Sequence, residues 1–322
     1  MKKLAITIGD PGGIGPEVVV KTLPAISGEC LPIVIGGSSV IEDAVRTFMV
    51  PLKIRKIEKV DEVFSSTDFL WCLDTGSLRA FTRGKADKEN GAASVNYIKK
   101  AVELAMEKRV DGMVTAPISK EALNLAGFSW PGHTEMLAEL TGTKEYAMML
   151  TGGPLKVILV TIHTALRNVP GLVTKERVLK TIRLAKKACD MLGIQRPVIA
   201  VSGLNPHAGE SGILGTEEME EIAPAIEGAR REGIIAEGPY PPDVIFRKAY
   251  KGEVDMVVCM YHDQGLIPLK MIAFDTGVNV TVGLPVIRTS PDHGTAYDIA
   301  WKGIADPSSM IEAIRLAVRL NL

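Results

Sequence analysis

The feature that most constrains the fold is an alternation of short apolar runs with longer amphipathic runs along almost the whole chain. The apolar runs have the length of β-strands, and the runs between them repeat apolar residues at three- and four-residue spacing, as helices do. Strands that alternate with helices predict an α/β protein with a largely parallel sheet. The expected strands are 4–8, 32–36, 52–57, 69–73, 111–115, 146–151, 155–162, 197–202, 254–260 and 278–282, and the expected helices are 16–23, 38–48, 91–108, 119–126, 134–141, 174–192, 216–232 and 307–320.

The run 174–192 illustrates the helical pattern. Val178, Ile182 and Ala185 fall on one apolar face, while Thr174 is expected to cap the helix and Gly193 to end it. The chain has no low-complexity stretch, linker or internal repeat. Composition therefore places no domain boundary, although this number of strands fits two lobes with a cleft between them.

Charge and cysteine usage exclude several classes of protein. The 37 Lys and Arg residues nearly balance the 38 Asp and Glu residues, which leaves a net charge of −1 and no attraction to nucleic acid or an anionic membrane. Cys30, Cys72, Cys189 and Cys259 form no CxxC pair, so buried thiols are expected rather than disulfides. No apolar run has membrane-spanning length, and the apolar start is too short for a signal peptide. We expect a soluble, cytoplasmic protein with a small-molecule partner.

The histidines are the first indication of chemistry. There are five in 322 residues, none lies in an apolar helical stripe, and several directly follow an expected strand. Ligand sites in α/β proteins form at such positions, and imidazole binds metals and transfers protons near neutral pH. The placement favours an enzyme active site; the alternative is a set of unrelated loop histidines. The residues are His133, His163, His207, His262 and His293.

Three of these histidines follow strands far apart in the chain. His163, His207 and His262 are separated by 44 and 55 residues, so no local zinc motif is present. Three strand ends can still build a three-histidine site that leaves one coordination position open for a substrate. Asp263 adjoins His262 and is suited to orient it as a carboxylate behind a metal ligand.

Two further segments are candidates for binding an anion. The glycine-rich segment 9–16 leads into a helix and is either a tight structural turn or a site at the helix N-terminus, but its spacing is not the dinucleotide fingerprint. Lys270, Arg288 and the turn 132–134 supply an ammonium, a planar guanidinium and an imidazole. A lone basic residue is usually a solvated surface charge. The range 259–300, however, gathers ionisable groups among glycines, and the hydroxyls that follow Arg288 suit an anion.

Six blocks of sequence carry a specific resemblance. They read GDPGGIGPE (9–17), TAPISKEAL (115–123), GHTEMLA (132–138), GLNPHAGESGILGTEE (203–218), MYHDQGLIPLK (260–270) and GLPVIRTSPDHGTAYDIAWKG (283–303). With these blocks the chain resembles the 4-hydroxythreonine-4-phosphate dehydrogenases of vitamin B6 biosynthesis. The last block is also similar to the cofactor loop of isopropylmalate and isocitrate dehydrogenases.

The resemblance implies a two-lobed isocitrate/isopropylmalate dehydrogenase-like α/β/α fold with a cleft between the lobes and no Rossmann domain. The first lobe, on the nucleotide side, would comprise 1–128 and 284–322. The second, 129–283, would carry the metal, the substrate and the interface of a homodimer whose metal site is shared between subunits. It further implies NAD or NADP as cofactor and a divalent metal, zinc foremost, with magnesium and cobalt as alternatives.

The resemblance also implies roles for individual residues. The implied metal ligands are His163, His207 and His262; the substrate-binding set is His133, Thr134, Lys270, Asn279 and Arg288; the aspartates near the reacting centre are Asp243 and Asp263; and the loop that borders the nucleotide contains Asp292, His293, Gly294 and Thr295. The family's pattern is broken in three places. Residues 165–166 are Ala-Leu where Pro-Leu is usual, 241–244 are Pro-Pro-Asp-Val where Pro-Ala-Asp-Thr is typical, and Trp301 replaces a common glycine.

The implied reaction is oxidation of 4-phosphooxy-L-threonine to 2-amino-3-oxo-4-phosphooxybutanoate, which loses carbon dioxide. A proton acceptor is needed for the hydroxyl, and Asp243, Asp263 or a water relay are the candidates. One alternative is a paralogue that oxidises 4-phospho-D-threonate or 4-phospho-D-erythronate. Others are a metal-dependent lyase or hydrolase without NAD, and a two-lobed binding protein without catalysis.

Overall fold

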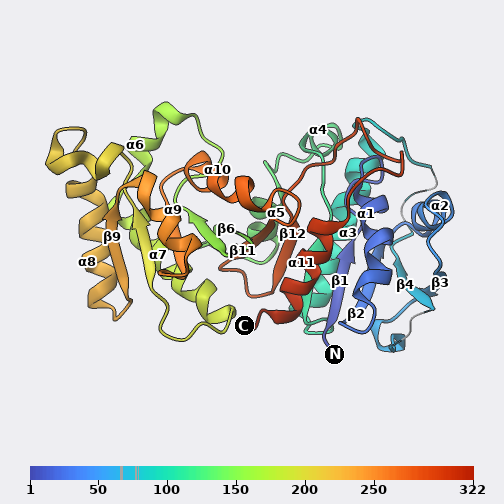
Figure 1. The fold of residues 1–322 in the computed structure, drawn as a ribbon. Helices are drawn as coiled ribbons and strands as arrows, with labels where there is room; N and C mark the ends of the chain where they lie inside the picture. The colour runs from blue at the N-terminus through green and yellow to red at the C-terminus, as the bar shows by residue number, and fades with distance from the viewer. Residues whose placement is uncertain (66–67, 77, 79) are drawn as a thin grey trace. The chain divides into compact units, whose positions relative to one another are not determined.

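The computed structural model describes residues 1–65, 68–76, 78 and 80–322. By its internal contacts the chain divides into two units, one of residues 1–144 with 284–320 and 322, and one of residues 145–283 with 321. The first unit thus includes 129–144, which the sequence resemblance assigns to the second lobe. The reason is that α5 (His133–Leu140) packs against α3 (Lys88–Met106) of the first unit. Figure 1 labels many of the helices and strands of the two units.

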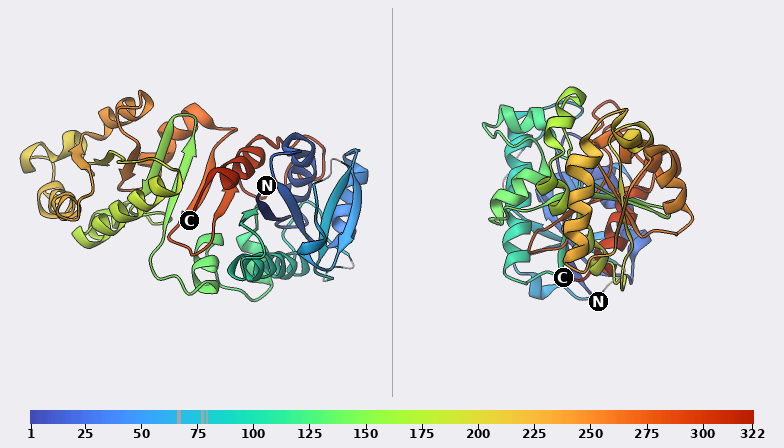
Figure 2. Two further views of the ribbon diagram at one scale, coloured as in Figure 1. Left: turned by 90° about the horizontal axis from the view of Figure 1, so that it is seen from below. Right: turned by 90° about the vertical axis from the view of Figure 1, so that its left-hand side faces the viewer.

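Unit 1 is built on a parallel sheet. Its strands pair in the order β3-β4-β2-β1-β5-β12, and every pairing in that series is parallel. Their bounds are β1 Lys3–Thr7, β2 Leu31–Gly36, β3 Lys53–Ile57, β4 Phe69–Asp74, β5 Gly112–Thr115 and β12 Arg288–Pro291. The helices are α1 Gly15–Thr22, α2 Ser38–Thr47, α3, α4 Lys120–Leu125, α5 and α11 Ser308–Arg319, with short turns at η1 Leu23–Ile26 and η2 Val60–Glu62. α3 packs on β1, β2 and β5, while α11 packs on β12 and β5 (Figure 2).

Unit 2 has a mixed sheet. The strand order is β11-β6-β7-β10-β8-β9, in which β6 is antiparallel to both neighbours and the series from β7 to β9 is parallel. The strands are β6 Ala147–Gly152, β7 Leu155–Leu159, β8 Ile199–Ser202, β9 Ala236–Tyr240, β10 Met256–Cys259 and β11 Val278–Val282. The helices are α6 Val169–Leu172, α7 Lys175–Met191, α8 Ala223–Arg231, α9 Pro242–Tyr250 and α10 His262–Ala273, with short turns at η3 Leu166–Asn168, η4 Pro206–Gly212 and η5 Glu218–Ile222.

A buried cluster holds the helices of unit 2 on its sheet. Side chains of β6, β7, β8 and β10 pack with Ile245 of α9 and with Leu266 and Leu269 of α10. α7 begins as predicted, because the Thr174 hydroxyl accepts a hydrogen bond from the Arg177 amide at 3.3 Å. It ends before Gly193, whose φ of +75° suits glycine. In the described residues no helix has both the length and the apolar character needed to cross a membrane.

The α/β class and every predicted strand and helix are confirmed, within a few residues at their ends. Apart from the short η turns, five strands and helices of the described residues were not predicted: β9, β12, α6, α9 and α10. β9 contains Gly238 and Pro239, and α10 contains Gly265 and Pro268, which disfavour strand and helix respectively. The packing of α10 on β7 outweighs that local preference.

Candidate active site

The predicted metal ligands and one predicted aspartate follow adjacent parallel strands of unit 2. His163 comes four residues after the end of β7, His262 three after β10 and His207 five after β8, while Asp243 lies three after β9. These strands are neighbours in the order β7-β10-β8-β9 and run in one direction. Their carboxyl ends therefore share one edge of the sheet, where ligands bind in open α/β sheets.

Two of the three predicted ligands lie side by side. The ring centroids of His163 and His262 are 5.8 Å apart. Nδ1 of His262 is 2.7 Å from Oδ1 of Asp263, which matches the predicted pairing of a ligand with an orienting carboxylate. With Nδ1 engaged in this way, Nε2 is the nitrogen left to meet a metal.

Backbone and amide hydrogen bonds join the three histidine segments. The Thr161 hydroxyl donates to the Met260 carbonyl at 2.7 Å, two residues before His163 and His262 respectively. The Met260 amide donates to the Gln264 side chain at 2.7 Å, and the amide nitrogen of Gln264 donates to the Gly203 carbonyl at 2.8 Å. Gln264 and Thr161 are buried. The segment that leads to His207 is thereby tied to the N-terminus of α10.

The third predicted ligand does not complete a cluster in the single chain. Among the residues that the structure describes, no group of three or more His, Cys, Asp or Glu side chains is placed to hold a metal ion. His207 is exposed and has a φ of +52°, in a turn whose backbone is left-handed from 207 to 211. The donor set nevertheless suits a divalent cation, since a pair of imidazoles with an orienting carboxylate faces the same sheet edge as His207.

The other predicted residues of unit 2 lie within its helices and strands. Asp243 is exposed in the first turn of α9. Lys270 is in the last turn of α10, where its ammonium lies 5.7 Å from the centre of the Phe274 ring. Asn279 is half-buried within β11, level with Leu150 of β6, rather than beyond the carboxyl end of its strand.

Arg288 is a buried cation in unit 1. It is 2% exposed, so it is not the solvated surface charge that a lone arginine usually is. Nε and Nη2 donate to the Thr115 hydroxyl at 3.1 and 2.8 Å. Burial lowers the pKa of Arg288 to about 9, well below the ordinary value of arginine, an effect that the charge of Glu135 partly opposes. A guanidinium in such surroundings is a strong site for a carboxylate or phosphate.

His133 opens α5 in the same unit, followed by the buried Thr134. Its Nε2 is buried and has no hydrogen-bond partner among the described residues. Burial holds the pKa of His133 well below 6.5, and the charge of Arg288 lowers it further. Gly132 provides no side-chain cap, so the first amides of the helix remain available to an anion.

The glycine-rich segment packs closely against neighbouring backbone. A Cβ at Gly9 would lie 2.2 Å from the Pro117 carbonyl oxygen, and one at Gly12 would lie 2.4 Å from that of Thr82. The Ile14 amide donates to the Thr295 carbonyl at 3.0 Å. The glycines therefore admit neighbouring backbone, and the Ile14 amide is already engaged. Thr289 is also structural, because its hydroxyl donates to the Ala313 carbonyl at 2.7 Å.

The predicted nucleotide loop packs on that glycine turn. Besides the Thr295 contact, the Tyr297 hydroxyl donates to Oδ2 of the buried Asp10 at 2.6 Å. Burial is the main cause that raises the pKa of Asp10. Asp292 and His293 are half-buried, and Gly294 is exposed. His293 Nδ1 lies 3.2 Å from the Gly294 carbonyl.

Trp301 fastens the end of this loop. Its indole N–H donates to the Pro11 carbonyl at 2.9 Å, and the Arg83 guanidinium lies 4.1 Å from the indole centroid. The rings of Phe48 and Phe81 are 5.6 and 5.1 Å away. The φ of Trp301 is +62°, a conformation that glycine adopts without strain.

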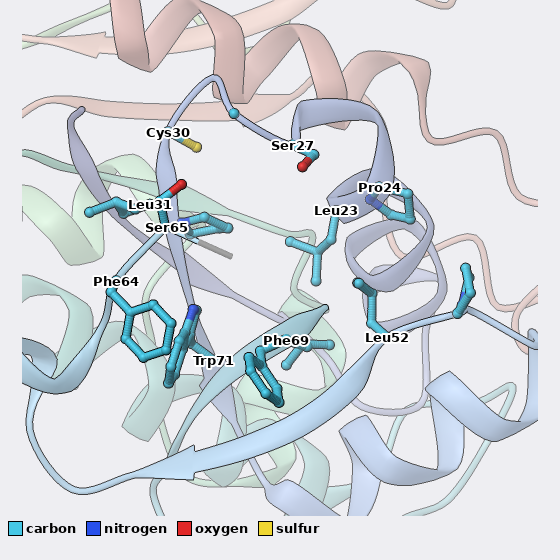
Figure 3. Close-up of a pocket in the computed structure, with 14 residues that line it drawn as sticks. Leu23, Pro24, Ser27, Cys30, Leu31, Leu52, Phe64, Ser65, Phe69 and Trp71 are labelled. Carbon is cyan, nitrogen blue, oxygen red and sulfur yellow. The ribbon is translucent and has the colours of Figure 1, made fainter. Parts of the chain in front are cut away.

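A cavity of about 180 Å³ lies elsewhere in unit 1 (Figure 3). It is lined by the first residues of β2 and β4, including Leu31, Phe69 and Trp71, at the amino-terminal edge of the sheet. Its one titratable side chain is Cys30, whose pKa burial raises to about 12. Among the described residues that line the cavity, none is charged near neutral pH.

The sequence pattern did not single out Thr115, Thr161, Gln264 or Glu218. Gln264 stands two residues after His262, and Thr161 two before His163. Proximity to a predicted ligand was the only available signal. Thr115 ends a predicted strand, and Glu218 ends a matched block, but neither position indicates a partner.

The family model for the pyridoxal phosphate biosynthetic protein PdxA matches residues 28–317. The 4-hydroxythreonine-4-phosphate dehydrogenase of Desulfosudis oleivorans is 48% identical over 98% of this chain and 95% of its own length. The D-threonate 4-phosphate dehydrogenase of Cupriavidus necator is 46% identical over 98% and 96%. The crystal structure of 4-hydroxythreonine-4-phosphate dehydrogenase from Klebsiella pneumoniae has a TM-score of 0.92 at 43% identity and covers 99% of this chain and 97% of that one. The resemblance expected from the sequence blocks is confirmed.

Proposed function

Because the chain belongs to the PdxA family, we propose that it is a dehydrogenase that oxidises the secondary hydroxyl of 4-phosphooxy-L-threonine. The hydroxyl loses its proton to a base and its carbon loses hydride to NAD or NADP. The product, 2-amino-3-oxo-4-phosphooxybutanoate, is a β-keto acid that loses carbon dioxide to give 3-amino-2-oxopropyl phosphate, in pyridoxine 5′-phosphate biosynthesis. The observation that carries the proposal is the line of His163, His262, His207 and Asp243 at the carboxyl ends of adjacent parallel strands.

His163, His207 and His262 are proposed to hold a divalent cation. Imidazole donors suit zinc best, and cobalt or magnesium are the alternatives. When bound, such a cation lowers the pKa of a hydroxyl and stabilises negative charge on its oxygen, while a nicotinamide ring accepts hydride. Asp263 orients His262 through Nδ1. Asp243 then remains as the aspartate assigned to accept the hydroxyl proton, directly or through water.

The substrate's anionic groups are proposed to meet the buried cation and the open helix end of unit 1. Arg288 presents a desolvated guanidinium, and the amides at the start of α5 lack a side-chain cap. His133 is neutral at pH 7, so its Nε2 can donate or accept a hydrogen bond according to its tautomer. Thr134, Lys270 and Asn279 complete the proposed set.

The loop of Asp292, His293, Gly294 and Thr295 is proposed to border the nucleotide. Its hydrogen bonds to the glycine turn fix its backbone, and Gly294 is exposed to approach by a ligand. The nucleotide is NAD or NADP, and kinetics with each distinguishes the two.

A homodimer with a shared metal site is proposed from exposed apolar side chains beside the histidines. On α10, Ile267, Met271 and Phe274 are 60%, 83% and 73% exposed at four- and three-residue spacing, which places them on one face. Leu166 and Ile213, in the segments after His163 and His207, are 68% and 77% exposed. A second subunit on this face would bury these residues and complete the cation's surroundings. The four free cysteines are buried, which suits the cytoplasm.

Oxidation of 4-phospho-D-threonate or 4-phospho-D-erythronate is the second candidate activity. A D-threonate 4-phosphate dehydrogenase is as similar over the same share of the chain as many of the 4-hydroxythreonine-4-phosphate dehydrogenases. The substitutions at 165–166 and 241–244 flank His163 and Asp243. They therefore adjoin a proposed metal ligand and the proposed proton acceptor.

Steady-state kinetics on 4-phosphooxy-L-threonine, 4-phospho-D-threonate and 4-phospho-D-erythronate, each with NAD and with NADP, tests both candidates. We expect the highest kcat/KM with 4-phosphooxy-L-threonine and formation of reduced nicotinamide. A higher kcat/KM with either phosphorylated sugar acid would favour the second activity. Turnover without reduced nicotinamide would instead indicate a metal-dependent lyase.

A further inference from the structure

We infer that Glu218 is a positioning residue that fixes the left-handed turn presenting His207 to the proposed cation. The inference rests on the proposed function, because it concerns the third ligand of that site. Glu218 touches neither the imidazole of His207 nor any other predicted site residue by a hydrogen bond of the described structure; its partners are in the backbone and side chains that lead into the turn.

The turn itself is conformationally disfavoured. The φ angles of His207, Ala208, Gly209, Glu210 and Ser211 are +52°, +53°, +78°, +45° and +57°. In this region a Cβ crowds the following carbonyl oxygen, so residues other than glycine rarely adopt it in succession. Four of these five residues carry a Cβ. Such a run persists only where contacts from outside the turn determine it.

Glu218 supplies such contacts at the start of the turn. Its side chain is 3% exposed. Oε1 accepts hydrogen bonds from the amides of Leu204 and Asn205, both at 2.7 Å, and Oε2 accepts one from Nδ2 of Asn205 at 2.9 Å. Hydrogen bonds to an ionised acceptor are stronger than neutral ones, so a carboxylate with three donors is a firm anchor.

The same carboxylate also packs against the middle of the turn. A Cβ at Gly209 would lie only 2.7 Å from Oε2 of Glu218 and 2.9 Å from the Gly215 carbonyl oxygen. A Cβ at Gly203 would lie 3.0 Å from Oε1. Glu218 thus occupies the space inside the turn, and the turn closes around it because glycine stands at 203 and 209.

Two independent anchors therefore act on one segment. Gln264, on the helix that begins with His262, holds the Gly203 carbonyl, and Glu218 holds the next two amides. The Gln264 bond ties this segment to the helix that begins with His262. The Glu218 bonds hold the backbone that leads into the turn with His207. Without Glu218 the segment keeps its start but loses the geometry that directs His207.

The experiment measures Zn²⁺ and Co²⁺ affinity of the full-length, metal-stripped protein by competition with a chromophoric chelator. The variants are Glu218→Ala, Glu218→Gln, Gly209→Ala and His207→Ala, with Glu220→Ala as the matched control on an exposed carboxylate of the same turn η5. The melting temperature of each metal-free variant is recorded in parallel. It separates loss of fold from loss of positioning.

We expect Glu218→Ala and Gly209→Ala to weaken metal binding about 10–100-fold, as changes behind a metal ligand do, with Glu220→Ala unchanged. The metal affinity of Glu218→Gln should lie between those of wild type and Glu218→Ala, because its one side-chain oxygen can still accept hydrogen bonds from the amides of Leu204 and Asn205. The inference is overturned if His207→Ala loses the metal while folded Glu218→Ala and Gly209→Ala bind it within twofold of wild type. If wild type binds no metal, or His207→Ala binds it normally, the metal proposal itself fails, and the inference fails with it.

Discussion

Replacement of Arg288 by methionine is expected to stabilise the ligand-free protein while it weakens substrate binding. Arg288 is 2% exposed, and burial lowers its pKa to about 9, well below the ordinary value of arginine. At about 1.4 kcal/mol per pKa unit this corresponds to roughly 5 kcal/mol against the charged form in the fold. Apolar replacement of buried ionic groups gains about 1–4 kcal/mol in practice, which is the range that we expect for Arg288→Met.

The direction of this pKa shift determines the sign of the stability change in Arg288→Met and the pH range over which it holds. A cation whose pKa is lower in the folded state than in the unfolded state destabilises the fold at every pH below its folded pKa. For Arg288 this destabilisation disappears only as pH rises from about 9 toward the ordinary pKa of arginine. The gain in Arg288→Met should therefore be constant between about pH 6 and 8. A gain of 1 kcal/mol raises the melting temperature of a unit of this size by about 2–4 °C, so a rise of at least about 2 °C is expected.

Calorimetry and steady-state kinetics measure the two effects on the same variant. The loss of charged hydrogen bonds of about 1.5–3 kcal/mol should raise the KM of the phosphorylated substrate about 10- to 150-fold, with the KM of the nucleotide little changed. The matched control is Thr115→Val, which removes the acceptor of Nε and Nη2 but leaves the charge in place. It should lower the melting temperature. A destabilised Arg288→Met with an unchanged substrate KM would refute the argument, and a collapse of nucleotide binding would place Arg288 in the cofactor site.

Three further predictions concern single side chains. His207→Ala should abolish metal retention and turnover while the melting temperature of the metal-free protein changes little, since the side chain is exposed; a fully active, metal-free variant would end the metal proposal. His133 stays neutral because burial lowers its pKa, so the unfolded chain takes up a proton that the fold does not. The free energy of unfolding should then fall by up to about 1.4 kcal/mol per pH unit below about pH 6.5, and urea titrations of His133→Gln should show a shallower slope. Trp301→Gly should raise the KM of the nucleotide about 2- to 10-fold through loss of aromatic packing, with the substrate KM as the internal control.

The periodicity of apolar residues predicted the elements whose local preference agrees with the fold. It located helix 174–192 with its cap and stop, because both the apolar face and the terminal residues point to the same structure. It missed α10, in which Gly265 and Pro268 oppose a helix, although Leu266 and Leu269 are buried against the sheet. Tertiary packing decided that segment, and no local pattern records it.

In the candidate site, too, local sequence predicted some features, while others depend on tertiary contacts. The order of strands was not predicted, yet His163, His207 and His262 were placed at strand ends, and parallel pairing then brings those ends to one edge. Asp263 could be paired with His262 because the two are adjacent in sequence. The contact of Arg288 with Thr115 spans 173 residues, and a burial that changes the pKa of an arginine has no signature in its neighbours. Likewise, the glycine-rich segment has the composition of an anion site but is filled by the chain's own backbone.

The left-handed turn shows why the least predictable backbone coincides with a predicted ligand. Local preference places His207 and Ala208 at negative φ, and only contacts with Glu218 and the glycines around it make the opposite sign stable. Such contacts cost conformational freedom and constrain the sequence at several positions. A fold has no need of them at a simple connection between β8 and α8, where a few unconstrained residues suffice. Departures from local preference persist where a side chain must be presented in one orientation, and His207 is the side chain that this turn presents.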